Sequence, residues 1–202
     1  GLPPHITAHT GIDALTHAIE SYLSGYAGRF SRDQSVRATE AIFAKLPVAY
    51  RNGQDLEARE AMALASYQAG MAFTRTYVGY VHAIAHQLGG IYHVPHGLAN
   101  AIVMPKVLSY CRPDIDGKLA ELARAAKVSD SPDDTQAADS FMEKLHGLLD
   151  TLEIPKTVAA LKSTDIEEIA QRAVDEAFGQ YPVPVQLSHA QICEILRSLL
   201  PN

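Results

Sequence analysis

Apolar residues recur every three or four positions along almost the whole chain, and no segment alternates apolar and polar residues between hairpin turns. This spacing predicts an all-α fold. The first expected helix begins at Thr10-Gly11-Ile12-Asp13 and ends near Ser24-Gly25. Two further long helices are expected, one from Ser31 to Arg51 and one over residues 56–74.

The rest of the chain keeps the helical spacing but is interrupted in several places. The segment 78–96 is rich in glycine and holds four of the nine histidines, a composition more typical of a site than of a packing helix. Beyond it we expect helices over 98–110 and 115–127, separated by a break at Cys111-Arg112-Pro113-Asp114. Three more helices are expected to end at Leu152, at Phe178 and near Leu200.

Composition limits the class of protein. A chain of 202 residues with 47% hydrophobic residues can bury the core of one domain. Its net charge of −6, without a run of basic residues, argues against a nucleic-acid or anionic-membrane partner. The two isolated cysteines, Cys111 and Cys193, form neither a disulfide framework nor a Cys-rich zinc site. With no apolar run of the roughly 18 to 20 residues that span a membrane, we expect a cytoplasmic protein.

Two phosphate-binding patterns are missing from the sequence. No G-x-G-x-x-G opens a strand-helix-strand unit, and no G-x-x-x-x-G-K-[ST] loop occurs. We therefore expect that this chain alone does not hold NAD(P).

Side chains suited to a metal ion occur at helical spacing. Asp13 and His17 lie four residues apart, which places both on one face of a helix, and His82 and His86 repeat this spacing. We expect Gly89-Gly90 and the following Val94–Gly97 segment to turn the chain so that His96 returns toward them. Asp13, His17 and two or three of the later histidines would then surround one divalent ion.

One carboxylate with several imidazoles and no thiolate suits Fe(II), Mn(II), Co(II), Ni(II) or Zn(II), and disfavours a structural zinc site. Taken singly these signals are weak. A histidine pair on one helix face is more often a surface or hydrogen-bonded core feature, and an Asp near a helix start is more often a cap. The number of such groups, joined by a glycine-rich segment, favours the metal site.

Three blocks of sequence resemble the iron-containing (group III) alcohol dehydrogenases. They are GIDALTHAIE at 11–20, GYVHAIAHQLGG at 79–90 and PHGLANA at 95–101, in the order and separation of that family. The resemblance covers the whole chain but about half of a family member, whose first half is a dinucleotide-binding α/β domain. It implies that residues 1–202 form the all-α, multi-helix metal-binding domain of the dehydroquinate synthase-like fold, and that the N-terminal nucleotide domain is absent from this chain.

The resemblance also assigns roles to single residues. It places the metal ligands at Asp13, His17, His82 and His96. His86 matches the histidine beside the nicotinamide and substrate, so it is expected to have a catalytic and cofactor-binding role as a pocket residue or proton relay. Phe73 matches a wall of the substrate pocket, although a core position is an equal alternative for an aromatic residue at helical spacing. His93 matches no family ligand, and we expect it at the surface.

The implied function is metal-assisted hydride transfer between a small alcohol or aldehyde and NAD(P), with Fe(II) or Zn(II) as the ion. We expect the isolated chain to be inactive, and apolar surface left by the missing half to favour a homo-oligomer. The substrate, the choice of NAD or NADP, and the choice of metal are not fixed by these residues.

Two alternatives stay open at this stage. A helical metal phosphohydrolase would rely on an adjacent His-Asp pair, which this chain lacks. A non-catalytic helical oligomerisation domain would use the histidines as satisfied core groups.

Overall fold

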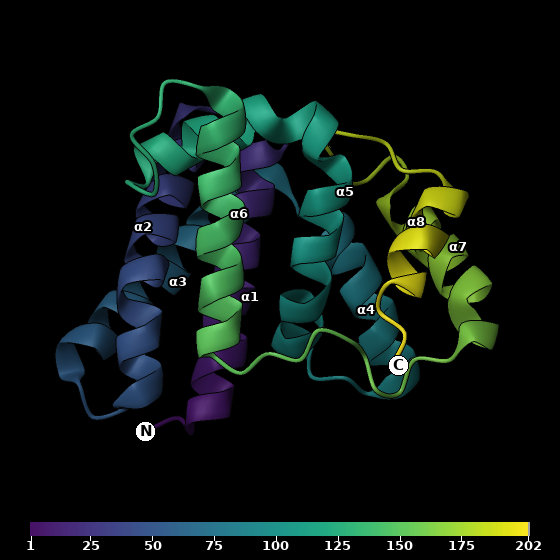
Figure 1. Cartoon of the computed structure of the whole chain (residues 1–202), viewed down its shortest axis with the longest axis horizontal. Helices are drawn as coiled ribbons and strands as arrows, with labels where there is room; N and C mark the ends of the chain where they lie inside the picture. Colours follow the sequence, from purple (N-terminus) through teal and green to yellow (C-terminus); the bar gives the residue numbers. More distant parts are fainter. Residues whose placement is uncertain (202) are drawn as a thin grey trace.

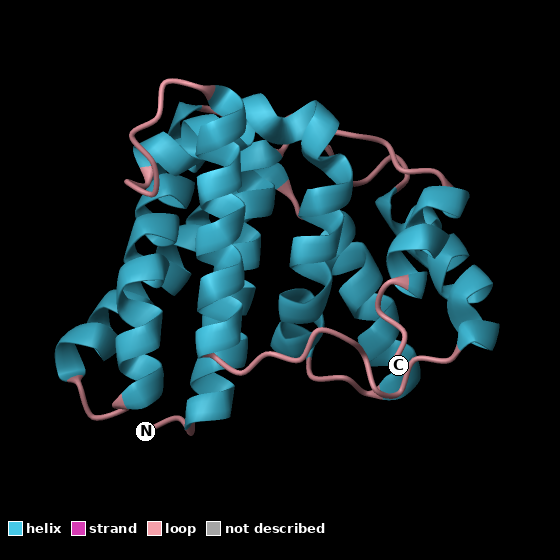
Figure 2. Ribbon diagram, in the orientation of Figure 1, coloured by secondary structure: helices cyan, strands magenta, loops and turns pink. Residues whose placement is uncertain are grey.

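Helices account for all the regular structure of residues 1–201, the part of the chain that this computed structural model describes (Figure 2). The all-α expectation is confirmed. The helices are α1 (Pro4–Leu23), α2 (Arg29–Arg51), α3 (Leu56–Thr76), α4 (Tyr80–Tyr92), α5 (His96–Ala125), α6 (Asp134–Thr151), the 3-10 helix η1 (Ser163–Asp165), α7 (Ile166–Ala177) and α8 (His189–Arg197).

Helix α5 lies between two groups of helices (Figure 1). On one side α1, α2 and α3 pack against one another, and α1 and α6 both contact α5. On the other side α4 packs against α5, α7 against α4, and α8 against α7. Helices α1, α4 and α5 therefore meet in the middle of the molecule, and these helices carry the three sequence blocks that contain the candidate ligands.

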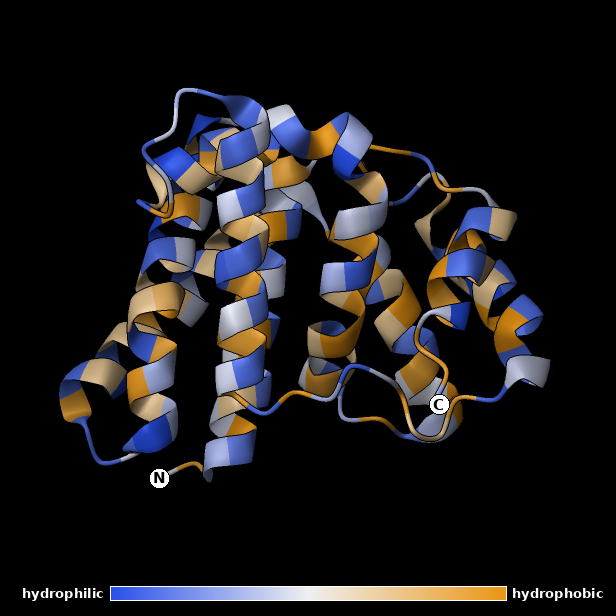
Figure 3. Ribbon diagram, in the orientation of Figure 1, coloured by the Kyte–Doolittle hydropathy of each residue, from blue (hydrophilic) through white to orange (hydrophobic). Residues whose placement is uncertain are grey.

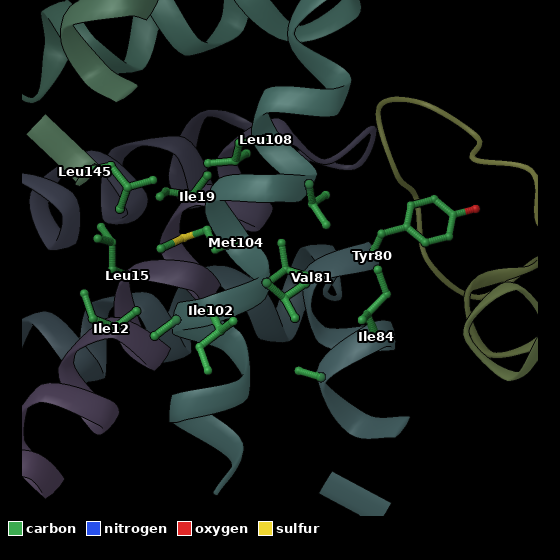
Figure 4. Packing of buried hydrophobic residues seen from close by; sticks show 14 of the residues in the cluster. Ile12, Leu15, Ile19, Tyr80, Val81, Ile84, Ile102, Met104, Leu108 and Leu145 are labelled. Atoms are coloured by element: carbon green, nitrogen blue, oxygen red, sulfur yellow. The ribbon is translucent and has the colours of Figure 1, made fainter. Parts of the chain in front are cut away.

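The core is built from the apolar stripes of these helices. Orange and blue segments alternate along the ribbons in Figure 3, as expected for amphipathic helices. Figure 4 shows buried side chains of α1, α4, α5 and α6 that belong to one hydrophobic cluster. Fully burying one such side chain stabilises the fold by roughly 1.5–3 kcal/mol. Those buried in this region include Ile12, Leu15 and Ile19 of α1, Val81 and Ile84 of α4, Ile102, Met104 and Leu108 of α5, and Leu145 of α6. The helices that carry the candidate ligands are therefore held in place by a packed hydrophobic core.

Helix α1 begins at Pro4, earlier than the expected start at Thr10-Gly11-Ile12-Asp13. Proline favours the first turn of a helix, and buried Thr7 and Ala8 give this extra turn a packed face. Gly11 lies inside α1, where the absence of a side chain allows α1 and α2 to approach closely. A Cβ atom at Gly11 would lie 2.4 Å from Cδ1 of Leu46.

The expected break at Cys111-Arg112-Pro113-Asp114 is wrong, because α5 runs without interruption to Ala125. Cys111 and Ile115 on either side of Pro113 are buried in the core, and this packing outweighs the hydrogen bond that the proline removes. Figure 1 shows the teal ribbon of α5 changing direction toward its end, the usual effect of a proline inside a helix.

The turn that leads to His96 also differs from the expectation. Gly89 and Gly90 lie inside α4, which continues to Tyr92, so they do not form the turn. The chain turns at His93, whose φ of 56° is in the left-handed region and ends the helix. His93 is exposed there, as expected.

Both cysteines are buried and unpaired. Burial raises the pKa of Cys111 to about 11, so its thiol stays protonated and unreactive near neutral pH. Within residues 1–201, no helix combines the length and the apolar character needed to cross a membrane.

Candidate metal centre

Three of the four expected ligands converge on one point between α1, α4 and α5. The Asp13 carboxylate oxygen Oδ1 lies 3.2 Å from Nε2 of His96 and 3.6 Å from Nε2 of His82. One ligand atom from each of these residues lies within 4.8 Å of the other two. Residues far apart in the sequence thus each bring one possible ligand atom to the same place.

The orientation of His82 is fixed from behind. Its Nδ1 lies 2.6 Å from Oε2 of Glu20 and donates to that carboxylate, which leaves Nε2 to face the site. Nε2 is buried, has no hydrogen-bond partner and lies 3.6 Å from the Asp13 carboxylate. A buried ring nitrogen without a hydrogen bond is costly in a native fold unless something binds it. Its position beside a carboxylate fits a cation, so the residues present fit a divalent metal ion.

Glu20 was not identified from the sequence, although it performs three tasks. Its side chain is 8% exposed and accepts hydrogen bonds from the backbone N–H groups of Gly79 and Val81, both at 2.8 Å, as well as from His82. It thus caps the N-terminus of α4 from α1. The available signal was its spacing, because Glu20 lies seven residues after Asp13 and three after His17 on one helix face.

Asn100 was also missed. Its Nδ2 donates to Oδ1 of Asp13 at 2.7 Å and lies 3.1 Å from Nε2 of His96. The Asp13 and His96 acceptors therefore converge on a hydrogen-bond donor, as they would on a cation. The sequence signal was again helical spacing, because Asn100 follows His96 by four residues in α5.

His17 lies beside this group and not within it. Its Nδ1 donates to the Asp13 backbone carbonyl at 2.9 Å and is 3.8 Å from the Asp13 carboxylate. The ring lies between Phe73, with stacked ring centroids 4.2 Å apart, and His82, with centroids 4.3 Å apart. Burial and the neighbouring His82 lower the pKa of His17 to about 4, so the ring is neutral at pH 7.

The charges favour a positive occupant. Burial alone would raise the pKa of Asp13, but the neighbouring His82 and His96 hold it well below its ordinary range. Burial alone would lower the pKa of His82, but the Glu20 and Asp13 carboxylates outweigh it and raise this pKa to about 9. One buried and one partly buried carboxylate, Glu20 and Asp13, thus flank the His82 imidazole. A bound cation could replace the proton that balances their charge.

His86 borders the same group from the exposed side. Its ring stacks on His96 with centroids 5.3 Å apart, and its Nδ1 lies 2.6 Å from Oε1 of Glu176 on α7. Glu176 also accepts from Tyr181 Oη and Gln87 Nε2, both at 2.7 Å. Burial alone would raise the pKa of Glu176, but the hydrogen bonds from His86 and Tyr181 lower it. Local spacing gives no hint of Glu176, because it comes from a distant helix.

Gly97 sets the distance between α5 and α1 beside the site. A Cβ atom at this position would lie 2.3 Å from the backbone carbonyl oxygen of His9. Since backbone cannot rotate away, we expect Gly97→Ala to lower the free energy of unfolding by about 1–3 kcal/mol. Urea unfolding followed by circular dichroism measures this loss.

Gly147 provides the matched control, because it is also helical and has open space around the position of a Cβ atom. We expect Gly147→Ala to stabilise the protein by about 0.5–1 kcal/mol. Equal effects of the two substitutions would contradict a backbone collision at Gly97.

The sequence matches a family model over most of its length. The model described as "Fe-containing alcohol dehydrogenase family, C-terminal" covers residues 7–200. Alcohol dehydrogenase 4 of Saccharomyces cerevisiae is 39% identical over 203 residues, which is 98% of this chain and 51% of that protein. The 1,3-propanediol dehydrogenase of Citrobacter freundii is 37% identical over 98% of this chain and 51% of its own length. The chain spans about half the length of the curated relatives it matches.

Solved structures agree with this assignment. The crystal structure of a 1,3-propanediol oxidoreductase superposes with a TM-score of 0.93 at 36% identity, over 98% of this chain and 53% of that one. An alcohol dehydrogenase from Oenococcus oeni gives a TM-score of 0.91 at 32% identity, over 98% and 52%. The chain therefore belongs to the Fe-containing alcohol dehydrogenase family and corresponds to the C-terminal, helical part of its members.

Proposed function

We propose that this chain is the metal-binding half of an NAD(P)-dependent alcohol dehydrogenase that acts on a small alcohol or aldehyde. Asp13, His17, His82 and His96 are the proposed ligands of Fe(II) or Zn(II). The observation that carries the proposal is the buried Nε2 of His82, which has no hydrogen bond and faces the Asp13 carboxylate beside His96. Membership of the family and a solved relative in complex with NAD⁺, a sulfoacetaldehyde reductase, support it.

The donor set suits this chemistry. One carboxylate and imidazoles without a thiolate leave a divalent ion with net positive charge and permit an open position. A divalent ion so held acts as a Lewis acid toward an alcohol or carbonyl oxygen, while a nicotinamide exchanges the hydride.

The ligand residues differ in what they contribute. Asp13 supplies the negative charge shared by the group, and Glu20 keeps Nδ1 of His82 protonated so that Nε2 is available. His17 is neutral at pH 7 because of its lowered pKa, so its second ring nitrogen is free to bind a cation. To join the group, the His17 side chain would have to rotate toward the Asp13 carboxylate, from its present position between Phe73 and His82.

We assign His86 to proton transfer and Phe73 to the substrate pocket. The Glu176 carboxylate holds Nδ1–H of His86, which leaves Nε2 free to accept a proton from the substrate oxygen and pass it to solvent. The half-buried Phe73 ring stacks on His17 and offers an apolar wall to the carbon chain of a substrate. Both roles depend on the metal site beside them.

The oligomerisation alternative is less favoured. It treats the histidines as satisfied core groups, whereas the buried Nε2 of His82 makes no hydrogen bond. The phosphohydrolase alternative lacks support as well, because its adjacent His-Asp pair is missing from the sequence.

Activity of the chain with and without a nucleotide-binding half tests the proposal. We expect the Fe(II)-loaded or Zn(II)-loaded chain to oxidise no alcohol with NAD(P), because the sequence has no dinucleotide-binding pattern. A fusion to the N-terminal half of the yeast relative is expected to oxidise ethanol or 1,3-propanediol. Turnover by the chain alone would contradict the proposal that NAD(P) is bound by another half of the enzyme. A folded fusion that binds metal and NAD but oxidises no short alcohol would contradict the proposed activity.

A further inference from the structure

A second group of metal-binding side chains lies where α7 packs against α8, on the C-terminal side of the molecule (Figure 1). Glu167 is in the first turn of α7, and His189 and Cys193 lie four residues apart on one face of α8. One ligand atom from each of the three residues lies within 4.8 Å of the other two. None of the three belongs to the Asp13 centre.

The distances are close to those of a tetrahedral zinc site. Nε2 of His189 lies 3.5 Å from Oε2 of Glu167 and 3.9 Å from Sγ of Cys193. With Zn–N near ~2.0–2.1 Å and Zn–S near ~2.3 Å, tetrahedral geometry puts such ligand atoms roughly 3.3–3.6 Å apart. The His189–Glu167 and His189–Cys193 distances thus exceed the tetrahedral values by a few tenths of an ångström at most. Nε2–H of His189 donates a hydrogen bond to the backbone oxygen of Glu167 at 3.0 Å, so binding an ion at Nε2 would replace this hydrogen bond and release its proton.

Local structure holds the three groups in position. Ser188 and Gln191 form a capping box at the start of α8, which fixes the turn that carries His189. Arg197 lies 3.3 Å from Oε1 of Glu167, so one carboxylate oxygen is paired and Oε2 stays directed toward His189.

The charges also suit a cation. Cys193 is 2% exposed, and its sulfur lies within 4.8 Å of a carboxylate oxygen of Glu167. A divalent ion between them would take the place of the thiol proton. The thiol proton is then released to solvent, and the thiolate becomes a ligand.

We propose that Glu167, His189 and Cys193 form a second divalent-metal site, of the zinc type, that joins α7 to α8. A thiolate selects zinc, cobalt or cadmium over magnesium and calcium, whereas the Asp13 centre has no sulfur ligand. Three protein ligands leave one position open to water. Because α7 also carries Glu176, which contacts His86, an ion here stabilises the helix that supports the first centre.

Cobalt titration of the purified chain distinguishes the two sites, because a thiolate gives Co²⁺ a near-ultraviolet charge-transfer band that imidazole and carboxylate do not. We expect two cobalt ions per chain and this band. Cys193→Ser is expected to lose the band and one ion. His82→Ala is expected to keep the band and lose the other ion.

Cys111→Ser is the matched control, because Cys111 is the other buried thiol and lies outside the group. It is expected to keep both ions and the band. Helical circular dichroism checks that each variant is folded, and Glu167→Gln, which keeps the thiol, is expected to weaken Zn²⁺ binding and reduce the rise in melting temperature that Zn²⁺ gives the wild type.

The outcomes separate the two sites. No thiolate band in the wild type, or a band that survives in Cys193→Ser, overturns the second site. A single ion that is lost in His82→Ala overturns it as well and leaves the first centre supported. A single ion that is lost in Cys193→Ser supports the second site and contradicts the first.

Discussion

Glu20→Ala is expected to lower the free energy of unfolding by about 3–5 kcal/mol, because three buried donors lose their acceptor together. These donors are the backbone N–H groups of Gly79 and Val81 and Nδ1–H of His82. A methyl group replaces none of these hydrogen bonds, and it uncaps the start of α4. Urea unfolding monitored by circular dichroism gives the difference directly.

Glu143→Ala is the control, because Glu143 is exposed on α6, and we expect it to change the stability by less than about 0.5 kcal/mol. Glu20→Gln keeps the size of the side chain but turns one acceptor into a donor that faces backbone N–H groups, so an intermediate loss is expected. A loss in Glu20→Ala no larger than that in Glu143→Ala would contradict the role of Glu20.

Glu20→Ala is also expected to weaken metal binding by about 10-fold to 100-fold, the usual effect of removing a residue that orients a ligand. Without Glu20, His82 has no fixed tautomer and its ring is free to turn. Chelator competition measures this loss on protein that is shown to be folded under the same conditions.

Helix existence could be predicted from the sequence because it depends on the spacing of apolar residues, a local property. Helix ends were less predictable. Gly11, Gly89 and Pro113 are residues that commonly interrupt helices, yet all three lie inside one. Gly11 is explained by the close approach of Leu46, and Pro113 by the buried neighbours on both sides. For Gly11 and Pro113, packing against another part of the chain outweighs the local preference for ending a helix.

The candidate site could likewise be predicted only in part. The pairs Asp13 with His17 and His82 with His86 could be found because each pair lies on one helix at a spacing of four. Glu176 could not be found in this way, because its contact with His86 spans 90 residues and depends on how α7 packs against α4. Residues that orient a site are harder to read from a sequence when they come from another helix.

The ring nitrogens of His82 connect the fold to the proposed chemistry. Nδ1 is tied to Glu20, which also holds the start of α4, and Nε2 faces the proposed metal position. The hydrogen bond that stabilises the junction of α1 and α4 is therefore the one that selects the tautomer needed for metal binding. Stability and metal affinity are expected to fall together when this hydrogen bond is broken.

Asp13→Asn is expected to lower the affinity of the first centre for Zn(II) or Fe(II) more than about 100-fold, equivalent to about 2.7 kcal/mol. Asp13 is the carboxylate nearest to both His82 and His96, and the substitution removes its charge while it keeps the size of the side chain. An amide oxygen still accepts from Asn100, so the loss reports charge more than shape. Elemental analysis after anaerobic loading, with chelator competition for the affinity, measures it.

The proposed second site would bind zinc as well, so the measurement is made in a Cys193→Ser background, where ions held by the Asp13 centre are counted alone. His146→Ala is the control, because this histidine is exposed on α6 and lies outside both groups. It is expected to keep about one ion per chain. If Asp13→Asn in the same background also keeps one ion with unchanged affinity, the carboxylate is not a ligand. The convergence of Asp13, His82 and His96 would then be a hydrogen-bonded feature of the core.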